Sequence, residues 1–134
     1  MIVLKKEFIE SIILHSKKEY PNEACGILGG KNGAVEKVYP MANVEKSPEL
    51  FLMDAAEQLK VLKDMRALGL EMCAIYHSHV ACPAYPSAHD VEMAFYPDAS
   101  YVIVSLKNPA QPSVRSFRIV DKKISEEHVN SPAV

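Results

Sequence analysis

The sequence predicts an α/β fold, a single three-layer domain in which helices flank a mixed β-sheet. Three observations predict it. The chain has 134 residues, which is the size of one domain. Segments with helical and with strand-like apolar patterns alternate along it. The runs 72–76 and 101–106 are almost continuously apolar, as in central strands that helices cover on both faces.

The first third of the chain predicts one helix and one hairpin. The helix runs from Ile2 to Tyr20, because apolar residues recur there at helical spacing, and Pro21 ends it. A strand from Ala24 to Leu28 follows. Lys31-Asn32-Gly33 is typical of a tight turn, so the strand from Ala34 to Tyr39 returns beside the first. The residues expected to face the core from the helix are Leu4, Phe8, Ile9, Ile12, Ile13 and His15.

The middle of the chain predicts a second helix. Asp54 and Glu57 form a capping-box pattern that opens this helix, and Gly69 ends it. After the apolar run 72–76, a third helix is expected from Ser87 to Phe95. The residues expected to face the core from the second helix are Leu59, Leu62, Met65 and Leu68.

The last part of the chain predicts the end of the domain. After the apolar run 101–106, a strand from Ser113 to Val120 completes the order helix, strand, strand, helix, strand, helix, strand, strand. The domain therefore covers residues 1–121. Residues 122–134 are polar, and we expect them to form a C-terminal extension that is a frayed, partly ordered tail.

Composition excludes several classes of protein. The 17 acidic residues and 15 Lys plus Arg give a net charge of -2, which argues against a general nucleic-acid binder. No apolar run approaches the roughly 20 residues of a membrane span, and the first seven residues lack the features of a signal peptide. The three cysteines, Cys25, Cys73 and Cys82, do not form a disulfide framework, and the first two are expected in the core. We therefore expect a soluble protein of the cytoplasm.

Chemically specific residues gather between positions 76 and 90. The strand 72–76 leads into His77 and His79, whose side chains project from the same face because side chains alternate along a strand. A loop with two prolines follows, and Asp90 then lies in the first turn of the third helix. Two imidazoles and one carboxylate are a ligand set of the catalytic zinc type, which leaves a fourth position for water. Hydrolysis at such a site also needs a base and a donor to the oxyanion, and Ser87 could supply the donor.

The motif identifies a family. His77-Ser78-His79, seven residues, Ser87, two residues and Asp90 match the pattern H-[ST]-H-x7-S-x2-D of the JAMM (MPN-plus) metallopeptidases. The resemblance implies that His77, His79 and Asp90 bind one Zn²⁺ ion and that Ser87 steadies the oxyanion. In that family a glutamate before the first hairpin is the general base, and the matching residue is Glu23. The fold implied is that of JAMM and cytidine-deaminase-like domains.

The resemblance also implies a substrate. JAMM enzymes hydrolyse peptide or isopeptide bonds at the C-terminus of ubiquitin-like proteins, and the segments 41–54 and 81–87 look most like the compact bacterial members. The expected function is zinc-dependent cleavage at the Gly-Gly-type tail of a ubiquitin-like sulfur-carrier protein, with release of cysteine. The tail is expected to lie extended along residues 50–53. Alternatives are a peptidase that trims residues after the carrier Gly-Gly and an inactive MPN-type interaction module.

Other interpretations of the motif are weaker. A zinc nucleobase deaminase needs H-x-E and P-C-x-x-C, whereas this chain has His79 at the third motif position and a single Cys82. A non-haem iron site also uses two histidines and one carboxylate, but in a different order. Whether the Cys82 thiolate competes for the metal is left open. His89 is expected at the surface, His15 at the edge of the core and His128 in the tail.

Overall fold

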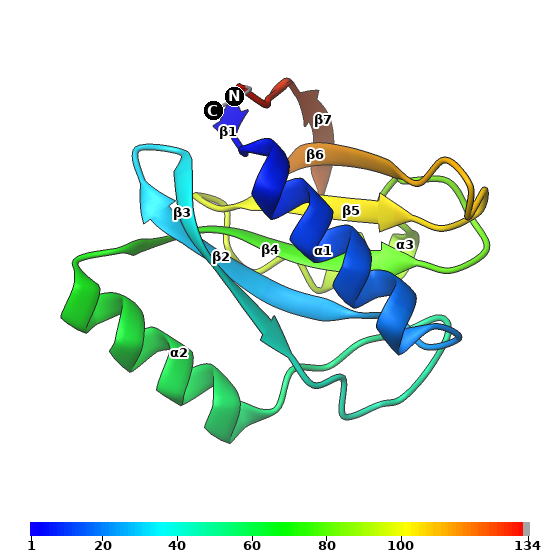
Figure 1. Cartoon of the computed structure of the whole chain (residues 1–134), viewed down its shortest axis with the longest axis horizontal. Coiled ribbons are helices and arrows are strands. Elements are labelled where there is room, and N and C mark those ends of the chain that lie inside the picture. Colours follow the sequence, from blue (N-terminus) through cyan, green and yellow to red (C-terminus); the bar gives the residue numbers. More distant parts are fainter. Residues whose placement is uncertain (133–134) are drawn as a thin grey trace.

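A mixed sheet of eight strands forms the centre of the structure, a computed structural model that describes residues 1–132 (Figure 1). The strand order is β7-β6-β5-β4-β2-β3-β1-β8. The α/β class and the mixed sheet direction expected from the sequence are confirmed. The elements within residues 1–132 are β1 (Ile2–Val3), α1 (Lys6–Glu19), β2 (Cys25–Lys31), β3 (Ala34–Met41), α2 (Ala55–Leu68), β4 (Glu71–His79), α3 (Ala88–Glu92), β5 (Ser100–Ser105), β6 (Ser113–Val120), β7 (Lys123–Glu127) and β8 (Val129–Asn130).

The two faces of the sheet carry separate parts of the core. Helix α1 covers one face, where Ile12 packs with Leu28, Tyr76 and Val102 from three central strands. On the other face, Met65 of α2 packs with a cluster from β2 and β3, among them Ile27, Tyr39 and Met41. Because both faces of the central strands are covered, their middle parts are almost continuously apolar, as in Ala74–Tyr76 of β4.

Strand β4 lies in the middle of the sheet and carries the histidine motif at its end. It pairs antiparallel with β2 and parallel with β5, and the parallel pairs run from Ala74–Ser100 to His79–Ser105. The connection from β4 to β5 contains α3, as expected for a crossover between parallel strands. The loop and the short helix α3 that follow His79 lie between β4 and β5 in the chain and pass across the end of the sheet at which β4 ends (Figure 1).

Both ends of the chain differ from the expectation. Ile2 and Val3 do not begin the first helix but form β1, which pairs parallel with β3 and with β8. Residues 123–130 form β7 and β8 at the two edges of the sheet, so the frayed tail expected over 122–134 is wrong for these residues. Strand β8 pairs with β1 at the opposite end of the chain, so no local pattern reveals it. Strand β7 forms a hairpin with its neighbour β6, but its residues Lys123–Glu127 are mostly polar and lack the apolar pattern of a buried strand. Residues 133–134, the end of that expected tail, lie outside the described residues.

The second helix presents a different face from the one expected. Among the four residues expected to face the core, only Met65 is buried, while Leu59, Leu62 and Leu68 are 54%, 43% and 51% exposed. The reason is geometric. Residues three apart are separated by about 300° around an α-helix, so a stripe at constant spacing of three turns away from the core. Val61, four residues before Met65, packs on the core instead.

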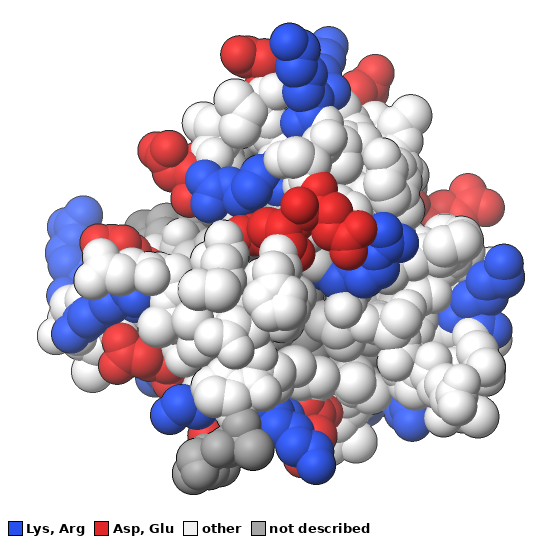
Figure 2. Space-filling model, turned by 90° about the horizontal axis from the view of Figure 1, so that it is seen from above, with Lys and Arg blue, Asp and Glu red and all other residues white. Residues whose placement is uncertain are grey.

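The surface carries charges of both signs. Seen from above (Figure 2), basic and acidic side chains lie interspersed among a larger uncharged area. The pattern agrees with the small net charge of -2. Among residues 1–132, no helix combines the length and the apolar character that crossing a membrane requires.

Candidate metal centre and active site

His77 and His79 project from the same face of β4, as their spacing predicts. Their side chains are almost fully buried, with 2% and 3% of the surface exposed. The ring of Phe51 stacks on the ring of His77 with centroids 4.7 Å apart. This stacking restricts rotation of the His77 ring. No local pattern predicts it, because Phe51 lies in a segment without a regular element.

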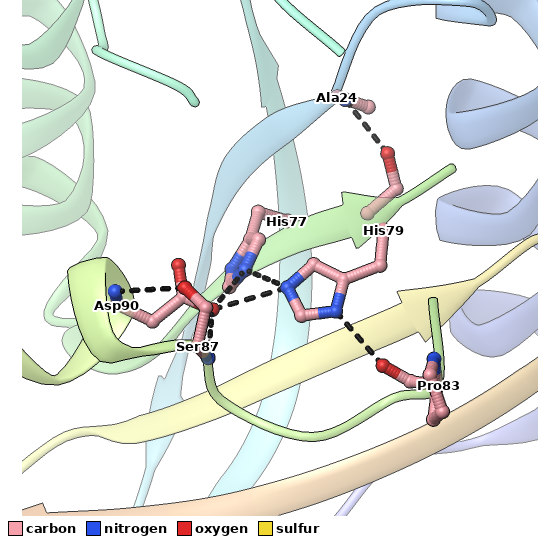
Figure 3. Close-up of polar contacts among 7 residues, drawn as sticks. Ala24, His77, His79, Pro83, Ser87 and Asp90 are labelled. Carbon is pink, nitrogen blue, oxygen red and sulfur yellow. Dashed lines mark hydrogen bonds and ion pairs between the residues drawn. The ribbon is translucent and has the colours of Figure 1, made fainter. Parts of the chain in front are cut away.

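Asp90 completes a cluster of three ligand atoms (Figure 3). The Nε2 atoms of His77 and His79 lie 3.1 Å apart. Asp90 Oδ2 lies 3.1 Å from the first and 3.0 Å from the second. Ligand atoms about 2.0–2.1 Å from a tetrahedral zinc ion are roughly 3.3 Å apart, so the spacing suits one small divalent ion.

Ser87 holds Asp90 in this position. The Asp90 N–H donates to Ser87 Oγ at 3.1 Å, and the Ser87 N–H donates to Asp90 Oδ2 at 2.9 Å, which is a capping box at the start of α3. The helix itself is shorter than expected, since it ends at Glu92 rather than Phe95. Because Ser87 Oγ accepts from Asp90, its own hydroxyl hydrogen remains available as a donor.

The hydrogen bond of His79 to the following loop fits a metal ligand. His79 Nδ1 lies 2.9 Å from the carbonyl oxygen of Pro83. A carbonyl only accepts, so Nδ1 carries the hydrogen, and in a neutral ring Nε2 then presents its lone pair to the cluster. The Nδ1 atom of His77 is buried and has no hydrogen-bond partner among residues 1–132. Both rings therefore direct Nε2 toward Asp90, and the donor set suits a divalent cation.

The charges of the cluster support the same interpretation. Burial raises the pKa of Asp90, but hydrogen bonds from His77 and His79 outweigh it and hold the pKa well below its usual range. For His79, burial lowers the pKa, but the hydrogen bonds with Asp90 and Pro83 and the charges of Asp90 and Glu23 together outweigh burial, so that the pKa is raised. Both imidazoles thus bond to the same oxygen, Asp90 Oδ2. A metal cation bound between these three groups can take the place of the protons in these hydrogen bonds.

Glu23 lies two residues before β2, close enough to this cluster for the charges of His79 and Asp90 to act on it. Two hydrogen bonds join the next residue, Ala24, to Ser78 of the motif. The Ser78 N–H donates to Ala24 O at 3.0 Å, and the Ala24 N–H donates to the Ser78 side-chain Oγ at 2.8 Å. Glu23 is only 4% exposed, and its Oε1 atom has no partner among the described residues. Burial raises its pKa to about 8, and the nearby His79 partly offsets this. A buried carboxyl group with an unused oxygen is suited to exchanging a proton.

A mostly apolar pocket opens next to the cluster. Its volume is about 180 Å³, and His77 and Asp90 form part of its wall. His89, expected at the surface, is half-buried and also lines this pocket. The other residues of the wall are Phe51, Leu52, Met53, Gln58, Ile75, Met93, Phe95, Tyr96 and Tyr101.

The remaining histidines and cysteines lie outside the cluster. Cys82 is exposed and does not belong to the group of ligand atoms found among residues 1–132. Burial raises the pKa of its thiol, and Glu23 and Asp90 raise it further. His15 lies at the edge of the core, as expected, and its Nδ1 is 2.7 Å from the Tyr76 hydroxyl.

Comparison with known families identifies the domain. A family model described as prokaryotic homologs of the JAB domain matches residues 5–120. The chain belongs to the JAB domain family. The resemblance to JAMM metallopeptidases inferred from the motif is thereby confirmed, and the chain is a JAMM-type peptidase.

Individual JAMM relatives cover most of the chain. The CysO-cysteine peptidase of Mycobacterium tuberculosis is 42% identical over 132 residues, which is 97% of this chain and 90% of that protein. A probable TtuB-protein conjugate cleaving protease of Thermus thermophilus is 37% identical over 95 residues, covering 70% of this chain and 64% of that protein. The solution structure of a protein from Desulfitobacterium hafniense superimposes with a TM-score of 0.90 at 44% identity, covering 100% of this chain and 94% of that one.

Proposed function

We propose that this JAMM domain is a zinc-dependent hydrolase that cleaves the bond after the C-terminal Gly-Gly-type tail of a ubiquitin-like sulfur-carrier protein and releases cysteine. The observation that carries the proposal is the cluster of His77 Nε2, His79 Nε2 and Asp90 Oδ2, mutually 3.0–3.1 Å apart, beside the buried carboxyl group of Glu23. The relative named a CysO-cysteine peptidase, which aligns over nearly the whole chain, supports cysteine as the leaving group.

The proposal assigns a role to each of five residues. His77, His79 and Asp90 hold the zinc ion, which when bound supplies the Lewis acidity that makes water a nucleophile near neutral pH. Glu23 takes a proton from the attacking water and delivers it to the leaving amine. Ser87 donates its hydroxyl hydrogen to the oxyanion, because its oxygen already accepts from Asp90 and its hydrogen is free.

The segment 50–53, here called the tail-binding edge, is proposed to receive the carrier tail. The carbonyl of Leu50 and both main-chain polar groups of Leu52 bond toward Asn43 and Val44. Alternate residues of an extended chain direct these groups to opposite sides, so those of Phe51 and Met53 face the other way. An extended Gly-Gly tail can pair with them as an added strand, and only a narrow peptide would then reach the metal.

The leaving group distinguishes this proposal from its alternatives. A peptidase that trims residues after the carrier Gly-Gly would use the same tail-binding edge, and so would a protease that cleaves carrier–protein conjugates. The Thermus relative is named for that last activity, at lower coverage of the chain. Cysteine is preferred because the relative named for it spans 97% of the chain.

Mass spectrometry tests the proposed function. The zinc-loaded protein is incubated separately with a carrier–cysteine adduct, an extended carrier precursor and a carrier joined to a lysine side chain. We expect the cysteine adduct to lose the mass of cysteine fastest. The matched control is Glu23→Gln, which keeps the size of the side chain but cannot accept the proton. Faster cleavage of the extended precursor or of the lysine conjugate would show that cysteine is not the preferred leaving group. No mass loss from any of the three substrates would contradict the proposal.

A further inference from the structure

Asn43 uses the full hydrogen-bonding capacity of its side chain. Its Nδ2 donates to the carbonyl oxygens of Glu23 at 3.0 Å and Leu50 at 2.9 Å. Its Oδ1 accepts from the main-chain N–H groups of Glu45 at 3.1 Å and Leu52 at 3.0 Å. Asn43 is only 8% exposed. A side-chain amide has two donor hydrogens and two acceptor positions, so nothing in this group is left unused.

These bonds connect the tail-binding edge with Glu23. The carbonyl of Glu23 binds to Asn43, and its N–H donates to the carbonyl of Ser47 at 2.8 Å. Both main-chain polar groups of Glu23 are thus held by one segment, residues 43–53. The Oε1 atom of Glu23 has no hydrogen-bond partner among the described residues. The position of the carboxyl group therefore depends mainly on the hydrogen bonds of the Glu23 main chain.

The segment 43–53 has little regular structure of its own. Its two arms are joined by one isolated bridge, Asn43 with Met53, and by the bond from the Val44 N–H to Leu52 O at 2.9 Å. The Asn43 side chain adds two hydrogen bonds to the far end of the segment, one with the Leu50 carbonyl and one with the Leu52 N–H. Phe51 and Met53 anchor the end of the segment on the core, while the rest has few main-chain bonds and opens at low free-energy cost. The Asn43 side chain therefore contributes much of the order of this remaining part.

We propose that Asn43 is a positioning residue that couples the tail-binding edge to Glu23. A tail that pairs with the edge orders the segment 43–53, and the Asn43 amide transmits this order to the main chain of Glu23. The base is then held in place most firmly when substrate is bound. This inference rests on the proposed function for the identity of the tail, but the hydrogen-bond coupling itself can be measured without substrate.

Three variants separate coupling from simple stability. Asn43→Asp keeps the shape and both acceptor bonds but loses the donors to Glu23 and Leu50. Asn43→Ala loses all four bonds. The matched control is Asn32→Asp, which makes the same chemical change at an exposed position of the turn between β2 and β3. Aspartate is tolerated there although φ is 53°, because short polar side chains adopt this backbone conformation readily.

Amide hydrogen exchange in the zinc-loaded protein is the first measurement. The Glu23 N–H is bonded to Ser47 and not to Asn43, so coupling predicts at least ~10-fold faster exchange of this hydrogen in both Asn43 variants, the effect of about one lost hydrogen bond. Asn32→Asp should leave it unchanged. Exchange of the Glu23 hydrogen at the wild-type rate would overturn the proposal. Equally accelerated exchange at Val102 in β5 would also overturn it, because the effect would then be global.

Steady-state kinetics with the carrier–cysteine adduct are the second measurement. Asn43→Asp should raise KM and lower kcat, each about 10-fold, with an unchanged zinc content. A change in neither, or a loss of activity that only follows a loss of zinc, would contradict the coupling. If the wild-type protein does not cleave the adduct, the proposed function fails, while the exchange rates still decide whether Asn43 couples the segment to Glu23.

Discussion

The hydroxyl group of Ser105, at the end of β5, donates a 2.6 Å hydrogen bond to the main-chain carbonyl of Cys82. Ser105 is buried and is paired with His79 across the parallel strands β4 and β5. The bond holds the loop after His79 at Cys82. The next residue is Pro83, whose carbonyl accepts a hydrogen bond from the His79 ring. Ser105 therefore orients a histidine of the cluster without touching it.

Replacing Ser105 should weaken metal binding. In Ser105→Ala the Cys82 carbonyl loses its donor, the Pro83 carbonyl is less well placed, and the tautomer of His79 is less well fixed. Loss of such outer contacts lowers metal affinity by about 10- to 100-fold, and we expect the lower part of that range. Titration with zinc in a competing chelator measures it. Ser125→Ala, an exposed serine of β7, is the control, and equal affinities of the two variants would refute the role of Ser105.

Replacing Glu23 by Gln should separate metal binding from turnover. The zinc content should remain that of the wild type, because Glu23 is not among the three clustered ligand atoms. Turnover of the carrier–cysteine adduct should fall by at least ~10²-fold, the usual contribution of a general base. Metal analysis and initial rates on the same preparation provide both values. A variant with near-wild-type turnover would remove Glu23 from the role of base.

His15 should make stability depend on pH. Burial lowers the pKa of His15 below 6.5, Lys18 adds to this and Glu19 opposes it. The folded protein then binds fewer protons than the unfolded chain just below pH 6.5, so stability falls as the pH decreases through this range. The free energy of unfolding should decrease less in His15→Gln between pH 7.5 and 5.5. Urea unfolding of both proteins, with His128→Gln as control, measures this, and parallel curves for wild type and His15→Gln would refute it.

Two side chains of α2 should differ sharply in their contribution to stability. Met65 is buried between the helix and the sheet, so Met65→Ala should cost about 2–5 kcal/mol of unfolding free energy. Leu59 is 54% exposed, and Leu59→Ala should change stability by no more than about 0.5 kcal/mol. Chemical denaturation compares the two variants. Similar losses would show that α2 packs with the face expected from the sequence.

Local patterns predicted most of the elements. The hairpin turn at residues 31–33, the helix N-cap at Asp54 and the strand Ser113–Val120 all appear where they were expected. Each depends on residues close together in the sequence, such as the Asp54 side chain that accepts from the Glu57 N–H. The second half of the expected capping box is not formed, because Glu57 Oε1 accepts from the Ala42 N–H instead. Interactions between distant residues were not predictable in this way. The pairing of Ile2–Val3 with Val129–Asn130 joins the two ends of the chain, and no local pattern reveals it.

The candidate site shows the same division. The spacing of His77, His79 and Asp90 predicted their convergence, because strand alternation and a short crossover are local properties. The stacking of Phe51 and the hydrogen bonds of Asn43 were not predicted, since both residues lie in a segment without regular structure. Phe51 contacts His77, which is distant in the sequence, and Asn43 bonds to backbone groups, which any residue type could provide. Residues that hold a site together are therefore harder to find from sequence than those that form it.

Zinc titration of the metal-free protein tests the central claim most directly. Calorimetry of the wild type should show one ion bound per chain, and His77→Ala or Asp90→Ala should each bind it at least ~100-fold more weakly, with Cys82→Ala as a control that retains wild-type affinity. Wild-type protein that takes up no metal, or His77→Ala and Asp90→Ala variants that bind zinc as tightly as the wild type, would contradict the account.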